Sequence, residues 1–370
     1  MTEKLLKSPL EEFHKREKAR MVNFSGWEMP VSYPNGIINE HIQTRESAGI
    51  FDISHMGQIV IKGPDSIKLL EEITPTHVGA IKPGKVKYSF FLQNDGGIID
   101  DLMITNADGF YYLVVNASRT SVGMNLLKDI NKKFSNASIK LLSENGMIAL
   151  QGPKAEEVLS KFFPKVDEMN FMEFSKSNFN EEEVFITRTG YTGEDGFEIS
   201  IPNDKAAELA ERLLAHDAVK PIGLAARDSL RLEMGYALYG HDIDAGTSPV
   251  EADMSWIIGK SREGYIGHGR IKSELENRPS RKLVGLKLLD KGIAREGAQI
   301  LSKDGDVIGA LTSGGHAPSL GYAIGQGYVE AEYSAIDTEI DVEVRGRKLA
   351  AIIVPRPFMK ASTKTGKKAA

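Results

Sequence analysis

Residues 96–118 carry the clearest structural signal in this chain and read Gly96-Gly-Ile-Ile-Asp-Asp-Leu-Met-Ile-Thr-Asn-Ala-Asp-Gly-Phe-Tyr-Tyr-Leu-Val-Val-Asn-Ala-Ser118. Two apolar runs flank Asp108-Gly109, and this pair is the strongest short-range signal for a two-residue hairpin turn. The stretch therefore predicts two antiparallel strands. The first strand carries two carboxylates, Asp100 and Asp101, among isoleucine, leucine and methionine side chains.

The two carboxylates are expected on opposite faces of that strand, because side chains alternate along a strand. Asp100 then shares a face with Ile98 and Leu102, and Asp101 shares the other face with Met103. Whichever face is buried, one carboxylate takes an apolar position. A buried charge without partners is costly, so such an aspartate is either well partnered or faces a pocket. We favour the pocket.

The surrounding elements predict an α+β fold. A strand–helix–strand–strand–helix–strand order around the hairpin is typical of a ferredoxin-like, split βαβ unit with an extra strand. The order partly recurs further along the chain. After about residue 275, short β-like runs alternate with Gly/Asp turns and predict a β-barrel or sandwich. Residues 24–34 look irregular. The predicted strands are 58–62, 87–92, 98–105, 110–116, 138–142, 147–151, 184–188 and 196–201, and the helices 36–48, 65–73, 118–134, 154–163, 205–215 and 223–234.

Composition excludes several classes of function. The 370 residues contain no cysteine, which excludes disulfides, thiolate nucleophiles and cysteine-based zinc or iron–sulfur sites. The net charge of −5 argues against general nucleic-acid binding. The N-terminus resembles neither a signal nor a transit peptide, and no run is apolar enough for a membrane span. We therefore expect a cytoplasmic protein, with no nucleic-acid or membrane partner.

A glycine-rich segment, Gly190-Tyr-Thr-Gly-Glu-Asp-Gly196, resembles a phosphate-binding loop only superficially. It lies between two predicted strands and does not open a helix, so a phosphate cradle is not expected. As a hairpin loop it delivers Tyr191, Glu194 and Glu198 to one end of a sheet. On the local sequence alone, a plain turn with exposed acids remains the simpler reading.

Two further motifs leave alternatives open. Arg227 and Arg231 share one side of the helix predicted to end near Met234, either in surface ion pairs or facing an anionic ligand. His241-Asp-Ile-Asp244 has no spacing typical of a metal site, and no metal is expected there. From the residues alone, the chain is an α+β enzyme or binding protein with an acidic pocket, and no reaction is assigned.

Several sequence blocks, taken together, resemble the aminomethyltransferase (T protein) family of the glycine cleavage system. They occur in the family's order and with its spacing, and they cover nearly the whole chain. The blocks are Gly49-Ile-Phe-Asp-Ile-Ser-His-Met56, the Gly-Gly-Ile-Ile-Asp-Asp-Leu segment, Leu150-Gln-Gly-Pro-Lys-Ala155, Arg188-Thr-Gly-Tyr-Thr-Gly-Glu-Asp-Gly-Phe-Glu198, Ala226-Arg-Asp-Ser-Leu-Arg-Leu-Glu233, Ser248-Pro, Thr312-Ser-Gly and Pro318-Ser-Leu-Gly321.

The resemblance implies a three-domain cloverleaf around a central tunnel, with two ferredoxin-like α+β domains and a C-terminal β-barrel-like domain. On this sequence, residues 1–56 and 143–270 would form a discontinuous folate-binding domain. Residues 57–142 would form the second domain, which carries the Asp100–Asp101 hairpin, and residues 275–360 the barrel. Residues 361–370 include Lys364, Lys367 and Lys368, and we expect a basic flexible tail there.

The implied reaction transfers a one-carbon unit from S-aminomethyl-dihydrolipoyl H protein to the cosubstrate tetrahydrofolate. The products are ammonia and 5,10-methylenetetrahydrofolate. No metal, flavin or nicotinamide is expected. The partners would be the lipoylated H protein and tetrahydrofolate.

The resemblance also assigns site residues. Asp101 matches the family's essential carboxylate, which would orient the reactive nitrogens of folate, stabilise positive charge or accept a proton. Asp100 would be structural. Glu198 matches the glutamate that accepts hydrogen bonds from the pterin, and Arg227 the arginine that meets the ligand. Trp256 is expected to wall the tunnel, with a core position as the alternative. The remaining matches line the pocket and are Met56, Tyr88, Val114, Asn116 and Tyr191.

The main alternative is a tetrahydrofolate-dependent demethylase of a methylated sulfonium or amine on the same scaffold. A non-catalytic folate-binding regulator is a third possibility. The chain departs from the family at Gly314-Gly-His-Ala317 and after Phe358, where Met359-Lys-Ala-Ser replaces an aromatic that many members place near the folate. No C-terminal contact to folate is therefore carried over.

Overall fold

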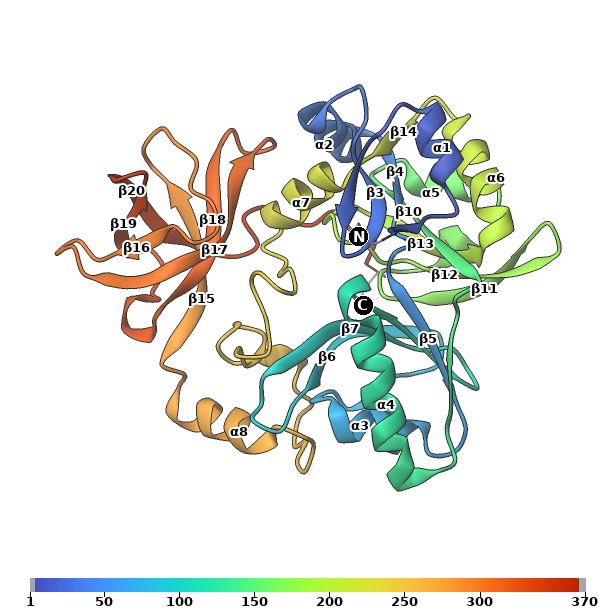
Figure 1. Ribbon diagram of the computed structural model, residues 1–370, viewed down its shortest axis with the longest axis horizontal. Coiled ribbons are helices and arrows are strands. Elements are labelled where there is room, and N and C mark those ends of the chain that lie inside the picture. Colours follow the sequence, from blue (N-terminus) through green and yellow to red (C-terminus); the bar gives the residue numbers. More distant parts are fainter. Residues whose placement is uncertain (1–3, 366–370) are drawn as a thin grey trace, which may run out of the picture.

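A computed structural model describes residues 4–365 and has the predicted α+β architecture (Figure 1). Its strands form a three-stranded, a five-stranded and a six-stranded sheet and a closed barrel. Figure 1 shows the barrel on the left, the five-stranded sheet at the bottom and the six-stranded sheet at the upper right. No helix in the described part of the chain is long and apolar enough to cross a membrane.

The five-stranded sheet contains the predicted hairpin. Its order is β6 (Lys85–Leu92), β7 (Ile98–Asn106), β8 (Tyr111–Val115), β5 (Gly57–Lys62) and β9 (Ser138–Leu141). Asp108 and Gly109 both have positive φ, at 51° and 100°, as the predicted turn requires. Helices α3 (Ser66–Ile73) and α4 (Thr120–Phe134) bury one face of the sheet with the side chains of Ile59, Leu102 and Leu127.

The six-stranded sheet has the order β11 (Phe174–Phe179), β12 (Glu182–Thr187), β13 (Gly196–Pro202), β10 (Asn145–Gln151), β4 (Ala48–Asp52) and β14 (Val219–Ile222). Helices α5 (Ala155–Leu159) and α6 (Asn203–Leu214) pack on this sheet, and α1 (Glu11–Arg16) packs against α6. The predicted helix 154–163 is too long by four residues at its C-terminal end. Phe162 and Phe163 pack on the core from the turn that follows α5.

The N-terminal residues differ from the expectation of an irregular segment. Strands β2 (Arg20–Phe24) and β3 (Trp27–Ser32) form a hairpin, and β1 (Leu6–Lys7) completes a three-stranded sheet. Ser25 and Gly26 both have positive φ in its turn. Helix α7 (Leu224–Glu233) packs against β3, and helix α2 (Ile37–Glu46) packs against α7, β4 and β14. Position 223, just before α7, must be glycine, because a Cβ there would lie 2.4 Å from the Val31 carbonyl oxygen.

The C-terminal β-rich region is a barrel and not a sandwich. Strands β15 (Arg281–Leu288), β18 (Tyr322–Glu330), β17 (Val307–Ala317), β16 (Gln299–Leu301), β19 (Glu339–Val344) and β20 (Arg347–Val354) close on one another in that order. Leu286, Ile300 and Ile353 are buried in its core. Helix α8 (His268–Asn277) precedes the barrel.

The expectation of a flexible tail over residues 361–370 is wrong for its first part. The Ser362 amide donates to the Gly193 carbonyl at 2.9 Å, and the Phe171 amide donates to the Lys364 carbonyl at 2.8 Å. The Lys364 ammonium also pairs with Glu156 at 2.8 Å. Backbone and side-chain bonds thus fix this segment. Residues 366–370 lie outside the described residues.

Candidate functional site

The Asp101 carboxylate lies where three adjacent strands meet. The Tyr88 hydroxyl on β6 donates to Asp101 Oδ2 at 2.9 Å, and Asn116 Nδ2, just after β8, donates to Asp101 Oδ1 at 2.7 Å. Asp101 shares its face with Met103, and that face packs toward the six-stranded sheet. Burial raises the pKa of Asp101, and the hydrogen bonds from Tyr88 and Asn116 oppose this shift. The carboxylate is thus partly buried and oriented by two hydrogen-bond donors.

Asp100 is fully buried and shares the Asn116 side chain with Asp101. Asn116 Nδ2 lies 2.8 Å from Asp100 Oδ1, and the Asn116 amide nitrogen lies 3.3 Å from Asp100 Oδ2. Burial, and then the nearby charge of Asp101, raises the pKa of Asp100 to about 8. One amide therefore bridges both carboxylates. Strand alternation did not predict this bridge, because Asn116 lies beyond the end of its own strand.

Trp256 borders the same group from a short helical turn, η4 (Ser255–Ile257). Its ring stacks on Tyr88 with centroids 6.2 Å apart and an interplanar angle of 24°. The residue is 70% exposed, so the alternative expectation of a core tryptophan is wrong. An aromatic face is thereby held open to solvent beside the phenol that orients Asp101.

A second group forms around the loop between β12 and β13, which is the predicted hairpin connection. A Cβ at Gly190 would lie 1.8 Å from Gln151 Oε1, so the loop requires glycine there. The next residue, Tyr191, lies under the Arg227 guanidinium, with Cζ 4.7 Å from the ring centroid. Within residues 4–365, the Arg227 guanidinium makes no hydrogen bond or ion pair, and burial lowers its pKa while the charge of Glu198 opposes that shift. Arg227 is therefore a desolvated cation whose donors remain unused.

Glu198 on β13 is the anionic member of this second group. Its Oε2 accepts a hydrogen bond of 2.6 Å from Thr189 Oγ1, and its Oε1 has no partner in the described part of the chain. The carboxylate therefore retains acceptor capacity beside the unused donors of Arg227. Such a pair suits a ligand that presents both donors and acceptors.

Apolar side chains underlie the two groups. Met56 and Val114 belong to the cluster between the five- and six-stranded sheets, together with Phe51 and Leu230. Val114 is buried and Met56 is partly buried. Burial is the largest cause of the raised pKa of the Tyr191 phenol. The charges of Arg231 and Arg227 oppose this shift, and the charge of Asp101 adds to it. All of the sequence-predicted site residues thus lie in one neighbourhood.

The two arginines of α7 have different surroundings. Arg231 is buried and bonds Asp228 at 2.8 Å, Asp242 at 2.7 Å and Ser313 Oγ at 2.8 Å. It is a structural residue, whereas Arg227 retains its donors. In the described residues no group of three or more His, Asp or Glu side chains could hold a metal ion.

Sequence reasoning missed the segment that follows α7. The Tyr236 ring stacks on Tyr191 at 5.7 Å and 24°, and the Tyr191 hydroxyl donates to the Ala237 carbonyl. The Tyr239 hydroxyl donates to the Ile98 carbonyl at 3.1 Å. The only sequence signal was a pair of tyrosines three residues apart, which indicates no specific contact.

The sequence of this chain matches two family profiles and many known proteins. The profile described as "GCVT N-terminal domain" matches residues 10–262, and the "Glycine cleavage T-protein C-terminal barrel domain" matches residues 281–360. The mitochondrial aminomethyltransferase of Dictyostelium discoideum is 40% identical, over 97% of this chain and 94% of that protein. The aminomethyltransferase of Bacteroides fragilis is 40% identical, over 95% and 99%.

A solved structure agrees with these relatives. The crystal structure of glycine cleavage system aminomethyltransferase T from Bartonella henselae is 38% identical in sequence and has a TM-score of 0.93. The match covers 98% of this chain and 100% of that one.

Proposed function

The chain belongs to the glycine cleavage T-protein family and is an aminomethyltransferase, and from this premise we propose the reaction partners and the role of each site residue. The donor is the S-aminomethyl-dihydrolipoyl arm of an H protein, and tetrahydrofolate is the cosubstrate that receives the one-carbon unit. Ammonia and 5,10-methylenetetrahydrofolate leave. Family membership confirms the resemblance stated from the sequence and supports this pairing.

One observation supports tetrahydrofolate most strongly: the unused hydrogen-bonding capacity of Arg227 and Glu198 around Tyr191. The pterin edge presents adjacent N–H donors, which a carboxylate such as Glu198 accepts in paired hydrogen bonds. The Arg227 guanidinium suits a ligand carbonyl or carboxylate. Tetrahydrofolate supplies the nitrogen nucleophiles of the reaction. Met56 and Val114 provide apolar contact below the ring.

Asp101 is the catalytic residue in this proposal. Hydrogen bonds from Tyr88 and Asn116 hold its two oxygens in place, so its negative charge has a fixed position in the site. A fixed charge in a buried site stabilises positive charge that develops on nitrogen in the transition state. The raised pKa of Asp101 also favours the acceptance of a proton by its oxygens during ring closure. Asp100 is a structural residue, which holds Asn116 in place.

We also propose the domain division expected from the sequence. The five-stranded sheet takes all its strands from residues 57–141, and the closed barrel takes its strands from residues 281–354, which supports boundaries near those positions. The six-stranded sheet contains β4, which precedes residues 57–141 in the chain, and five strands that follow them. The central tunnel, with Trp256 on its wall, and the cytoplasmic location remain predictions.

The test measures ammonia and 5,10-methylenetetrahydrofolate production from aminomethylated lipoyl H protein, with and without tetrahydrofolate. We expect rapid ammonia release that depends on tetrahydrofolate. Turnover only with methylated sulfonium or amine donors would replace the proposal with the demethylase alternative. Binding of tetrahydrofolate without turnover of any donor would favour the non-catalytic regulator.

A further inference from the structure

Residues 236–242, here called the central loop, follow α7 and contact the β12–β13 loop, strand β7 and the barrel. The loop contains the Tyr236–Tyr239 pair and ends in the His241-Asp242 motif, to which the function above assigns no role. Tyr236 and Ala237 contact the candidate site, and Tyr239 contacts β7. Asp242 and the Tyr236 carbonyl contact the barrel.

Two loop residues contact Tyr191, which also lies against Arg227. The Tyr236 ring stacks on the Tyr191 ring, and the Ala237 carbonyl accepts the Tyr191 hydroxyl. The Tyr191 ring thus contacts both the central loop and Arg227. Its position in the site therefore depends on the position of the loop.

A third loop residue reaches the strand that carries the carboxylates. The Tyr239 hydroxyl donates to the Ile98 carbonyl at 3.1 Å, and Arg119 lies over the Tyr239 ring at 5.1 Å. Arg119 Nε also donates to the Ile99 carbonyl at 2.8 Å. The loop is therefore tied to β7 directly before Asp100 and Asp101.

Asp242 anchors the loop to α7 and to the barrel. Its Oδ2 accepts hydrogen bonds from Arg231 at 2.7 Å, from the Leu238 amide at 2.9 Å and from Ser313 at 3.0 Å. Thr312 donates to its Oδ1. Arg231 Nη1 closes the arrangement by bonding the Tyr236 carbonyl at 3.1 Å. Asp242 is 1% exposed, so water does not replace these contacts.

We propose that Asp242 is a positioning residue for ligand binding: through the central loop it fixes Tyr191 relative to β7 and Arg227. This inference rests on the proposed role of Tyr191 in tetrahydrofolate binding. Asp242 itself touches no residue of the candidate ligand site by hydrogen bond. The contacts that link Asp242 to the ligand site run through Tyr236, Ala237 and Tyr191.

The experiment measures the dissociation constant for tetrahydrofolate in the full-length protein, well below the melting temperature of each variant. Asp242→Asn keeps the side-chain volume and removes the charge that holds Arg231 and the Leu238 amide. We expect a dissociation constant about tenfold higher, as for the loss of one to two well-placed hydrogen bonds. Ser313→Ala removes one barrel contact of Asp242 and is expected to act in the same direction, about threefold.

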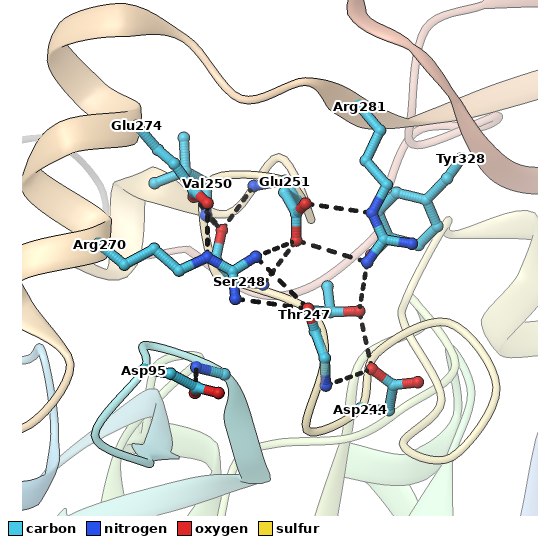
Figure 2. A network of polar contacts seen from close by, with 12 residues as sticks. Asp95, Asp244, Thr247, Ser248, Val250, Glu251, Arg270, Glu274, Arg281 and Tyr328 are labelled. Atoms are coloured by element: carbon cyan, nitrogen blue, oxygen red, sulfur yellow. Dashed lines mark hydrogen bonds and ion pairs between the residues drawn. The ribbon is translucent and has the colours of Figure 1, made fainter.

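Glu251→Gln is the matched control. Figure 2 shows Glu251 between Arg270 and Arg281, and its Oε2 lies 2.8 Å from Arg270 Nη2. Glu251 is buried, like Asp242, and also joins a loop to the barrel, but it makes no hydrogen bond with residues 236–242. We expect this variant to lower the melting temperature and to leave the dissociation constant unchanged.

A double-mutant cycle with Tyr191→Phe tests the route of the effect. If Asp242 acts through Tyr191, the double variant binds about as weakly as the weaker single variant. Multiplied effects, an unchanged dissociation constant in Asp242→Asn, or equal losses in Glu251→Gln would each overturn the inference. A parent chain that does not bind tetrahydrofolate would overturn the proposed function, and this inference with it.

Discussion

Replacing Asp101 with asparagine separates the catalytic use of this carboxylate from its effect on stability. The substitution keeps the size and planar shape of the side chain and removes its charge. In the parent protein the charge is oriented by hydrogen bonds of 2.9 Å from Tyr88 and 2.7 Å from Asn116. Loss of one oriented electrostatic group in a buried site typically lowers kcat by about 10²–10³, or about 3–4 kcal/mol.

Stability is expected to move the other way. Because burial raises the pKa of Asp101, its ionised form is disfavoured in the folded protein relative to water. A neutral amide avoids this desolvation. We therefore expect Asp101→Asn to melt at the same temperature as the parent or higher at neutral pH, as measured by calorimetry.

Asp100→Asn is the matched comparison, since the two residues are adjacent and share Asn116. Asp100 is fully buried and its contribution to the site is the bond to Asn116. Weakening that bond costs about 1 kcal/mol and lowers turnover by about tenfold at most. The assay is tetrahydrofolate-dependent ammonia release from aminomethylated H protein. Equal losses of turnover in two well-folded variants would refute the separate roles given to these carboxylates.

Three further predictions concern the surroundings of this pair. Arg227→Met should raise the dissociation constant for tetrahydrofolate by roughly 10- to 100-fold without loss of thermal stability, because Arg227 is desolvated and unpaired in the described chain; lower stability with unchanged binding would contradict its ligand role. Burial lowers the pKa of His55 from 6.5 to about 4 in the folded protein. As the pH falls, His55 is therefore protonated in the unfolded protein before it is protonated in the folded protein. Stability should fall by about 3 kcal/mol as the pH drops from about 6.5 to 4, and denaturant titrations of His55→Gln should show a shallower decline over that range. Gly190→Ala forces a Cβ to within 1.8 Å of Gln151 Oε1 and should cost about 1–3 kcal/mol in chemical denaturation; a neutral result would show that the loop shifts freely.

Local signals predicted much of the fold. The Asp108-Gly109 turn was readable because both positions require positive φ. The hairpin of β2 and β3 was missed, because its turn is Ser25-Gly26, which is a weaker signal, and its strands mix a proline and charges with aromatics. The predicted helix at α5 was too long because Phe162 and Phe163 continued the apolar pattern. These side chains pack on the core from a turn and not from a helix.

For the candidate site, too, the sequence predicted some features and missed others. Resemblance to a family named the residues, but their contacts depend on which elements meet in space. The bridge from Asn116 to both carboxylates requires the register of β7 and β8. The stack of Tyr191 on Tyr236 joins residues that are forty-five positions apart, counted from 191 to 236. Trp256 could not be assigned to surface or core from its neighbours in the sequence alone.

The pairing of β4 with β10 has a consequence for the order of events during synthesis. All five residues of β4 are buried, yet its antiparallel neighbour begins at residue 145 and its parallel neighbour β14 at residue 219. At translation rates of about 5–20 residues per second, β4 waits roughly 5–20 s for β10 and longer for β14. The intervening residues 57–141 can meanwhile complete their own sheet on the ribosome. The nascent chain therefore carries an apolar, unpaired strand behind an already folded unit, and this interval is when it most needs protection from aggregation.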